Sequence, residues 1–389
     1  PLIFRQIAVN VLLELHYTAK RLVADAGAIQ TPTLMIGAGK DWVVSLKAQR
    51  KFFDRLSSSE KYFEIFPEAY HAIFQETNRN EVVDLVRRFV SEQFVKTTTT
   101  PSLQSADKSG FTFSEYERLK NNGSAKFAVA RAGLRIASKL SRGIAVGQQN
   151  GFDSGLALDY VYKNEARGLG PVGRLIDKSY LSSPGWRGIR QRRANLEKAL
   201  RDLILKVHRE NRTVQILDIA AGVGRYVIET IRALPEIPIA ATLCDYKQEN
   251  VDAARSLADG SNLNGAVVVQ RGDAFDRESV SRIEPRATIG IVSGLYELFP
   301  SNDAVLNSLH GLARVIEPGG YLVYTNQPWH PQLEFIAHVL RNREGERWIM
   351  RRRTTAEIDQ LVRMAGFEKI DMEIDQWGMF TVSVAQRGR

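Results

Sequence analysis

Short apolar segments alternate with amphipathic segments through the second half of the chain. The apolar segments are rich in Val, Ile and Leu and end at small or polar residues, as expected of strands buried on both faces. The segments between them carry apolar residues at helical spacing. This alternation predicts an α/β fold with a mostly parallel sheet. The expected strands cover residues 216–219, 239–243, 266–270, 288–292 and 320–325.

The first expected strand breaks into small residues in the pattern D-x-A-x-G-x-G. Glycines at a strand-to-helix turn let the backbone bring its N–H groups close to a ligand, and the helix N-terminus favours negative charge. A dinucleotide site would show G-x-G-x-x-G, whereas this spacing is typical of S-adenosylmethionine (SAM) loops. The expected cofactor contacts here are Asp218, Ala220, Gly222 and Gly224.

Polar residues also follow the next three strands. A carboxylate at the end of the second strand can accept both hydrogen bonds of a ribose diol. Because the carboxyl ends of parallel strands share one edge of the sheet, the later strand ends should face the same ligand. As an alternative, the carboxylate after the third strand caps a helix. The expected cofactor contacts are Asp245, Tyr246, Asp273, Ala274 and Ser293.

Four of these segments, LDIAAGVG, LCDY, RGDAF and EPGGYLVYTN, together resemble the class I SAM-dependent methyltransferases over roughly residues 150–389. The segments SGLYELF, TNQPWHPQLE, GERWIMRRRTTAEID and DQWGMFTVSVA resemble, more narrowly, the methyltransferase family fused behind an α/β hydrolase. The resemblance implies a Rossmann-like fold with a seven-stranded, mostly parallel sheet, a C-terminal antiparallel hairpin and SAM as cofactor. One departure is Ala220, which stands where many members carry glycine and which requires a negative φ.

Methyl transfer depends mainly on positioning, and it needs a base only when the acceptor atom is protonated. The acceptor-side candidates follow the fourth and fifth strands: Tyr296, Glu297 and His330. His330 has a near-neutral reference pKa that suits a general base, with Glu297 as the alternative. The structural alternative is that His330 only hydrogen-bonds the backbone.

The N-terminal segment shows a different pattern. One short strand ends near Asp41, and a second strand, over residues 62–66, leads to His71. This order resembles the C-terminal end of a lysophospholipase-like α/β hydrolase, in which the nucleophile comes first. The motif G-x-S-x-G is absent from the 389 residues, and the chain starts on Pro1. We therefore expect a fragment whose serine lies upstream, unless Asp41 and His71 are ordinary surface residues.

A polar Thr/Ser/Pro tract separates the two patterns and predicts an interdomain linker. The expected organisation is an incomplete hydrolase domain over residues 1–95, the linker over residues 96–110, a helical region with the methyltransferase cap over residues 111–210, and the SAM-dependent methyltransferase domain over residues 211–389. Residues 152–155 in the cap either close over the cofactor or form a purely structural element.

Composition narrows the setting. With 44% hydrophobic residues and no apolar run of about 20 residues, the chain is expected to be globular without a transmembrane helix. The single Cys244 fits a reducing compartment, so we expect a cytoplasmic protein. The histidines are scattered without ligand spacing, so no metal site is expected.

A net charge of +9 raises the question of anionic partners. A basic amphipathic stretch over residues 127–144 either packs on its own domain or contacts a membrane surface. The runs at residues 187–193 and 351–353, with Trp186 and Trp348 nearby, would suit nucleic acid. The sequence thus favours SAM-dependent methylation of a small-molecule or lipid-like acceptor by a bifunctional protein. The alternatives are an RNA methyltransferase and a non-catalytic SAM-binding scaffold.

Overall fold

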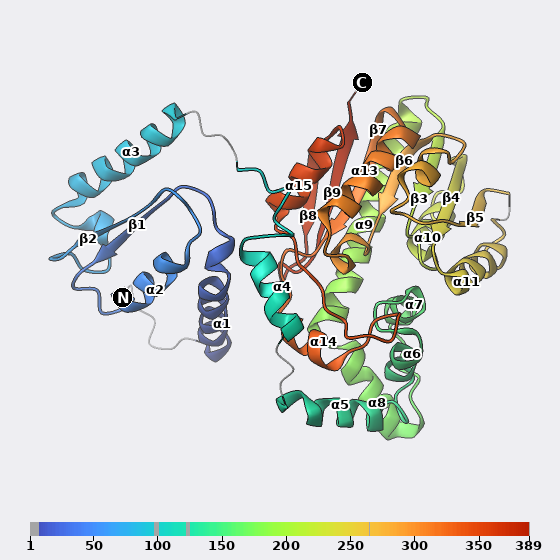
Figure 1. Ribbon diagram of the computed structural model, residues 1–389, viewed down its shortest axis with the longest axis horizontal. Coiled ribbons are helices and arrows are strands. Elements are labelled where there is room, and N and C mark those ends of the chain that lie inside the picture. Colours follow the sequence, from blue (N-terminus) through green and yellow to red (C-terminus); the bar gives the residue numbers. More distant parts are fainter. Residues whose placement is uncertain (1–7, 97–100, 122–124, 264, 389) are drawn as a thin grey trace. The chain divides into compact units, whose positions relative to one another are not determined.

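The computed structural model describes residues 8–96, 101–121, 125–263 and 265–388 (Figure 1). The chain divides into two compact units, Pro1–Pro101 and Ser102–Arg389. Within the described residues, no helix combines the length and the hydrophobicity that crossing a membrane requires.

The second unit is built on a seven-stranded sheet in the order β5-β4-β3-β6-β7-β9-β8. The first five strands in this order run parallel, and β9 pairs antiparallel with both β7 and β8. This arrangement confirms the predicted Rossmann-like fold with its C-terminal antiparallel hairpin. The strands are β3 (Val214–Asp218), β4 (Ile239–Asp245), β5 (Val267–Arg271), β6 (Ala287–Val292), β7 (Ile316–Asn326), β8 (Phe367–Ile374) and β9 (Thr381–Arg387).

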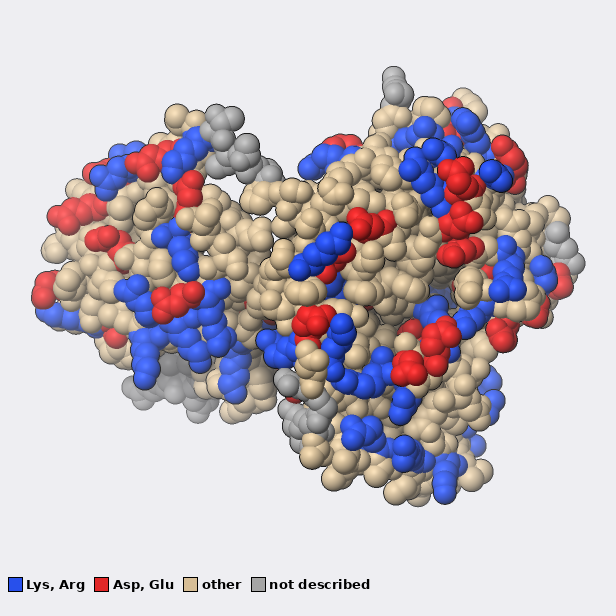
Figure 2. All heavy atoms as spheres, viewed as in Figure 1, with Lys and Arg blue, Asp and Glu red and all other residues tan. Residues whose placement is uncertain are grey.

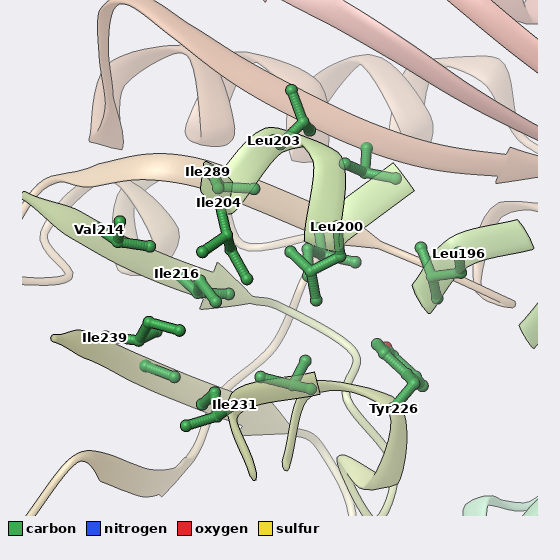
Figure 3. Packing of buried hydrophobic residues seen from close by; sticks show 14 of the residues in the cluster. Leu196, Leu200, Leu203, Ile204, Val214, Ile216, Tyr226, Ile231, Ile239 and Ile289 are labelled. Carbon is green, nitrogen blue, oxygen red and sulfur yellow. The ribbon is translucent and has the colours of Figure 1, made fainter. Parts of the chain in front are cut away.

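Helices cover both faces of the sheet. On one face, α9 packs the apolar side chains of Leu200 and Ile204 near Ile216 and Ile289, and Leu196 of the same helix lies farther along the cluster (Figure 3). Burial of each such side chain stabilises the fold by about 1.5–3 kcal/mol. The other face is covered by α13 and α15. The flanking helices are α9 (Pro184–Arg209), α10 (Arg225–Arg232), α11 (Gln248–Asp259), α12 (Arg277–Ser281), α13 (Asn302–Val315) and α15 (Thr355–Met364).

Shorter helices form a cap at the carboxyl edge of the sheet. The basic amphipathic stretch expected over residues 127–144 is two helices, because Ser141 starts a new one by accepting a hydrogen bond from the Ile144 N–H at 3.2 Å. Arg131 donates to the His338 carbonyl at 3.0 Å instead of facing outward. The cap helices are α4 (Phe111–Asn121), α5 (Lys126–Ala137), α6 (Arg142–Asn150), α7 (Gly155–Lys163), α8 (Gly170–Leu181) and α14 (Leu333–Val339).

The tract expected as a linker differs from the prediction in its second half. The Asn302 N–H donates to Asp107 at 2.8 Å, and the Leu103 N–H donates to the Gln360 side chain at 2.8 Å. These bonds supply partners for polar groups of a segment that has little apolar surface to bury. Residues 102–110 therefore belong to the second unit.

The first unit pairs two parallel strands, β1 (Thr33–Ala38) and β2 (Lys61–Phe66). Three helices accompany them: α1 (Val9–Asp25), α2 (Leu46–Arg55) and α3 (Arg79–Val95). A parallel pair with helices between and after its strands is an α/β arrangement, as expected of a hydrolase segment.

Candidate functional site

The turn between β3 and α10 depends on two glycines. Gly222 and Gly224 have φ values of +58° and +69°, a region that side chains with a Cβ avoid. A Cβ on Gly224 would also lie 2.5 Å from the Leu243 side chain. Ala220 is not among the residues with positive φ, so alanine fits its position. The loop thus has the tight course that the sequence predicts.

Asp245 joins this loop to the end of β4. One carboxylate oxygen accepts the Gly222 N–H at 2.9 Å, and the other accepts the Lys247 N–H at 3.0 Å and the Asn250 amide at 2.9 Å. The side chain is buried beside the glycine loop. Asp245 therefore both fixes the loop and places negative charge where a ribose diol would donate hydrogen bonds.

A hollow of about 50 Å³, the glycine-loop hollow, lies over this turn. Its walls include the predicted residues Ala220, Gly222, Gly224, Asp245 and Ser293. Its roof is the lid, residues 152–163, which also lines the hollow. Ligand sites usually enclose about 300–1,000 Å³, so the residue types suit SAM but the lid has to move to admit it.

Specific contacts hold the lid down. A Cβ on Gly222 would lie 3.4 Å from the Gly155 Cα, which shows how closely the start of α7 approaches the loop. Asp159 pairs with Arg225 of α10 at 2.5 Å. Asp153 accepts the Arg343 N–H at 2.6 Å. Of the two alternatives for residues 152–155, these contacts favour closure over the glycine-loop hollow.

Three predicted cofactor residues lie elsewhere. Tyr246 is 55% exposed, and the Arg271 guanidinium lies 5.6 Å from its ring centroid. Asp273 and Ala274 border a separate hollow of about 240 Å³. The Asp273 carboxylate accepts the N–H of Phe275 at 2.9 Å, and α12 is capped by Asp276 instead. The structure therefore does not bring these three residues to the glycine-loop hollow.

Asp218 lies beneath the loop and is fully buried. The Tyr226 hydroxyl and the Ala220 N–H donate to its carboxylate. Burial raises the pKa of Asp218 to about 7, although the bond from Tyr226 acts in the opposite direction. Asp218 does not line the glycine-loop hollow, so the expected direct contact with the cofactor is not what the structure shows. Its carboxylate instead supports the loop from beneath, through the hydrogen bond from Ala220.

The raised pKa of Asp218 predicts a pH-dependent effect of Asp218→Asn. Between about pH 4 and pH 7 the folded state keeps a proton that the unfolded chain releases, so wild-type stability falls as pH rises through this window. Asparagine cannot ionise and keeps an oxygen for Tyr226. We therefore expect the free energy of unfolding of Asp218→Asn, relative to that of wild type, to be larger at pH 8 than at pH 5. The difference between the two pH values should be at least about 1 kcal/mol, or roughly 2–4 °C in Tm.

Asp177→Asn provides the matched control, measured by the same thermal unfolding series. Burial acts against its charge, but hydrogen bonds from Ser141 and Tyr160 lower the pKa of Asp177. Its contribution is present above about pH 4 and is lost in acid. Asp177→Asn should therefore destabilise at neutral pH, with a difference that shrinks in acid. Identical pH profiles for the two variants would contradict both assignments.

A cavity of about 470 Å³, the large cavity, adjoins the glycine-loop hollow. The two share Asp153, Leu158, Arg192 and Gly294 as walls. The rest of the lining is mainly apolar and comes from cap helices α5, α6, α8 and α14, from the start of α9 and from segments that follow strands of the sheet. It includes two stacked indole rings, Trp186 and Trp348, whose centroids are 6.4 Å apart. Among the described residues, no group of three or more potential metal ligands converges.

Buried polar atoms converge on this cavity. Arg192 donates to one carboxylate oxygen of Glu297 at 2.8 Å, and both side chains are buried. The second Glu297 oxygen, Oε2, has no partner among the described residues. The same is true of Gln327 Nε2 and Trp348 Nε1. Since buried polar groups are normally hydrogen-bonded, these atoms are candidates for ligand contacts.

His330 lines the large cavity, but its hydrogen bonding leaves Nε2–H as a donor and not as a free base. Its Nδ1 accepts the Gln332 N–H at 3.1 Å, so in the neutral ring the proton sits on Nε2. Burial lowers the pKa of His330 to about 4, which keeps the ring neutral. The backbone hydrogen bond foreseen as the alternative is therefore what the structure contains, and a general-base role does not fit this geometry.

Tyr296 does not reach the cavity. Its ring packs in the core between the sheet and α13, and its hydroxyl donates to Ser308 at 3.0 Å. The next residue, Glu297, does line the cavity, because successive side chains of the short 3₁₀ helix Tyr296–Leu298 point about 120° apart. Position after a strand predicts closeness to the site but not the side toward which each residue points.

Arg192 is a residue of the candidate site that the sequence analysis missed. It was grouped with a basic run suited to nucleic acid, yet it is buried and pairs with Glu297. Its spacing from Ile189, Leu196 and Leu200 places it on the apolar face of α9. That helical period is the signal that would have identified it.

The second basic run, residues 351–353, is buried throughout. Arg351 and Arg353 are each 1% exposed and bind Asn302, Glu357 and several carbonyl groups. Trp186 and Trp348 line the large cavity instead of an outer surface. These residues therefore do not form the nucleic-acid surface considered from sequence.

In the first unit, Asp41 and His71 are brought together. His71 Nδ1 lies 3.1 Å from one carboxylate oxygen of Asp41. The other oxygen accepts the N–H groups of Val43 and Val44 at 2.8 Å and 3.0 Å. The bond from Val44 contributes most to lowering the pKa of Asp41. This is the geometry of a carboxylate that orients an imidazole, as predicted from the strand order.

The fold and the site together define a Rossmann-like methyltransferase. Residues 86–387 match the model of a family described as "Putative methyltransferase", and residues 1–78 match the model described as "Serine aminopeptidase, S33". The chain belongs to this methyltransferase family. The assignment confirms the class predicted from the glycine loop and agrees with SAM as cofactor.

Individual relatives extend the comparison. The chain is 43% identical over 395 residues to "Uncharacterized protein YnbC" of Escherichia coli K12, covering 100% of this chain and 67% of that protein. A crystal structure of a possible exported protein from Bordetella parapertussis is 18% identical, covers 76% of this chain and 100% of its own, and has a TM-score of 0.53. Magnesium protoporphyrin IX methyltransferase from Synechocystis, with bound SAH, is 13% identical over 61% of this chain and 98% of its own, with a TM-score of 0.42.

Proposed function

We propose that this chain is a SAM-dependent methyltransferase whose acceptor is a small or lipid-like apolar molecule carrying one protic group. The observation that carries the proposal is the shared wall between the glycine-loop hollow and the large cavity. A molecule in the large cavity would meet a cofactor held at the loop across Gly294 and Arg192. Such juxtaposition is the main requirement for transfer between two bound molecules.

The cofactor side rests on the loop and on Asp245. The backbone of the glycine loop would lie along the cofactor, and Asp245 would accept hydrogen bonds from the ribose diol. When bound, SAM supplies an electrophilic sulfonium methyl group. The lid would cover the site and exclude water from it.

The acceptor side rests on Glu297. Its free oxygen, Oε2, would accept the proton that the acceptor loses, while Arg192 holds the other oxygen. Burial raises the pKa of Glu297, with Arg192 opposing, and a raised pKa makes the carboxylate a stronger base. His330 Nε2–H, Gln327 and Trp348 would donate to polar atoms of the acceptor.

The lining also favours a neutral acceptor. Among the described residues around the large cavity, Arg192 is the only arginine or lysine, and its charge is balanced by Glu297. A phosphate or carboxylate inside this cavity would lack a cationic partner, and burying an unpaired charge is costly. The burial of residues 351–353 argues equally against RNA as the acceptor.

Incubation of the purified chain with methyl-labelled SAM and a total lipid and metabolite extract tests the proposal. We expect SAH release together with label in an uncharged, organic-soluble product, identified by mass spectrometry. Asp245→Ala serves as the inactive control. SAM binding without SAH release in any extract would instead indicate a non-catalytic SAM-binding scaffold. Label recovered in RNA would indicate an RNA methyltransferase.

We further propose that Asp41 and His71 are the orienting carboxylate and the base of a hydrolase module, which would make the whole protein bifunctional. Their hydrogen bond and the S33 family match over residues 1–78 support this. The nucleophile would lie outside these 389 residues, since the chain spans about two thirds of its Escherichia coli relative. Esterase turnover by the present chain alone would contradict this proposal.

A further inference from the structure

An outer surface of the cap combines exposed apolar side chains from two helices. Val129 and Ile136 of α5 are 80% and 67% exposed, and Val172 and Leu175 of α8 are 63% and 68% exposed. Leu169, just before α8, is 72% exposed. Its N–H donates to the carbonyl of Leu140, which follows α5, at 2.7 Å, so the two helices are joined here. We name these five apolar residues and the cations beside them the α5–α8 face.

The charge on this face has one sign. Arg135 lies in the last turn of α5, Lys139 follows that helix, and Arg174 and Lys178 lie on α8. All four are exposed, and none forms an ion pair with a described residue. No Asp or Glu occurs in the sequence between Glu117 and Asp153, a stretch that includes α5, and the one acidic residue of α8, Asp177, is buried. Figure 2 shows Lys and Arg side chains without Asp or Glu over α5 and α8, at the lower edge of the view.

The α5–α8 face continues into the large cavity. Leu175 belongs to both, since it is mostly exposed and also lines the cavity. Leu134 of α5 and Ile176 of α8 line the cavity directly behind the face. An apolar path therefore runs from the outer surface to the cavity that would hold the acceptor.

We propose that the α5–α8 face docks on an anionic lipid bilayer and that the large cavity receives its acceptor from that bilayer. Exposed aliphatic side chains ringed by Lys and Arg are the combination that binds at a bilayer interface, because the former enter the acyl boundary and the latter attract anionic headgroups. The docking step stands on the surface alone. The delivery step rests on the proposed methyltransferase function.

Sedimentation of the full chain with vesicles tests the docking. We expect binding to phosphatidylcholine vesicles that contain phosphatidylglycerol, weak binding to phosphatidylcholine alone, and loss of binding at high salt. The apolar variant Val129→Ser with Val172→Ser and the charge variant Arg135→Glu with Lys178→Glu should each weaken binding at least about tenfold. None of these four side chains lines the large cavity.

Matched controls carry the same substitutions elsewhere on the second unit. Val268→Ser with Ile370→Ser alters two exposed apolar residues on β5 and β8, and Arg232→Glu with Arg282→Glu alters two exposed cations; neither pair should change binding. Equal binding to neutral vesicles, or full binding by both α5–α8 variants, would overturn the proposal. The assay contains no SAM, so its outcome is independent of methyl transfer.

Discussion

Asp245→Ala is expected to abolish measurable SAM binding in titration calorimetry. The carboxylate makes three hydrogen bonds at 2.9–3.0 Å that fix the glycine loop to β4, and it is the predicted acceptor for the ribose diol. Each hydrogen bond to a charged group contributes about 1.5–3 kcal/mol. Loss of the ribose contacts alone should weaken binding by roughly two orders of magnitude or more.

The control for this variant is Asp252→Ala, which removes an exposed carboxylate from α11, the helix that follows β4. It should leave SAM affinity unchanged. Because Asp245 also orders the loop, thermal unfolding has to accompany the titration. A folded Asp245→Ala protein that binds SAM as tightly as wild type would exclude the glycine loop as the cofactor site.

Glu297→Gln should lower kcat by about 10²- to 10⁴-fold, the usual contribution of a general base. Glutamine keeps the shape of the side chain but cannot accept the acceptor's proton. SAM affinity should stay unchanged, since Glu297 lines the large cavity and not the glycine-loop hollow. Single-turnover methyl transfer and calorimetry separate the two effects.

The pH profile sharpens this test. A base works in its ionised form, so wild-type activity should fall as pH drops through the pKa of Glu297, which burial places above the usual range for glutamate. Glu297→Asp should restore part of the activity and the acid limb, whereas Glu236→Gln, at an exposed position, should behave as wild type. Full activity of a folded Glu297→Gln protein would remove the base assignment.

The glycine loop and the sheet were predictable because both are local patterns. Buried parallel strands are continuous apolar runs, and the loop needs small residues at fixed spacing from Asp218. Closure of residues 152–155, the start of the lid, over the cofactor was foreseen only as one of two alternatives. Here the deciding contact, between Gly155 and Gly222, joins residues far apart in the sequence.

The large cavity was not predictable for the same reason. Its walls come from α5 to α9 and from the segment around α14, and no single stretch shows their convergence. The basic runs suggested a nucleic-acid surface because only their charge was considered. The helical period of the apolar residues in α9 places Arg192 on the buried face of that helix. The prediction of a linker was wrong for the polar tract after Pro101, because composition does not reveal its hydrogen bonds to the distant residues Asn302 and Gln360.

Asp153 and Leu158 belong to the lid and also line the large cavity. A cofactor that lifts the lid must therefore change the shape of the space beside it. In thermodynamic terms the two binding equilibria are linked, and linkage is reciprocal: whatever factor SAM applies to acceptor affinity, the acceptor applies to SAM affinity. Occupancy of the glycine-loop hollow therefore changes the affinity of the large cavity for its ligand, and occupancy of the large cavity changes the affinity for SAM.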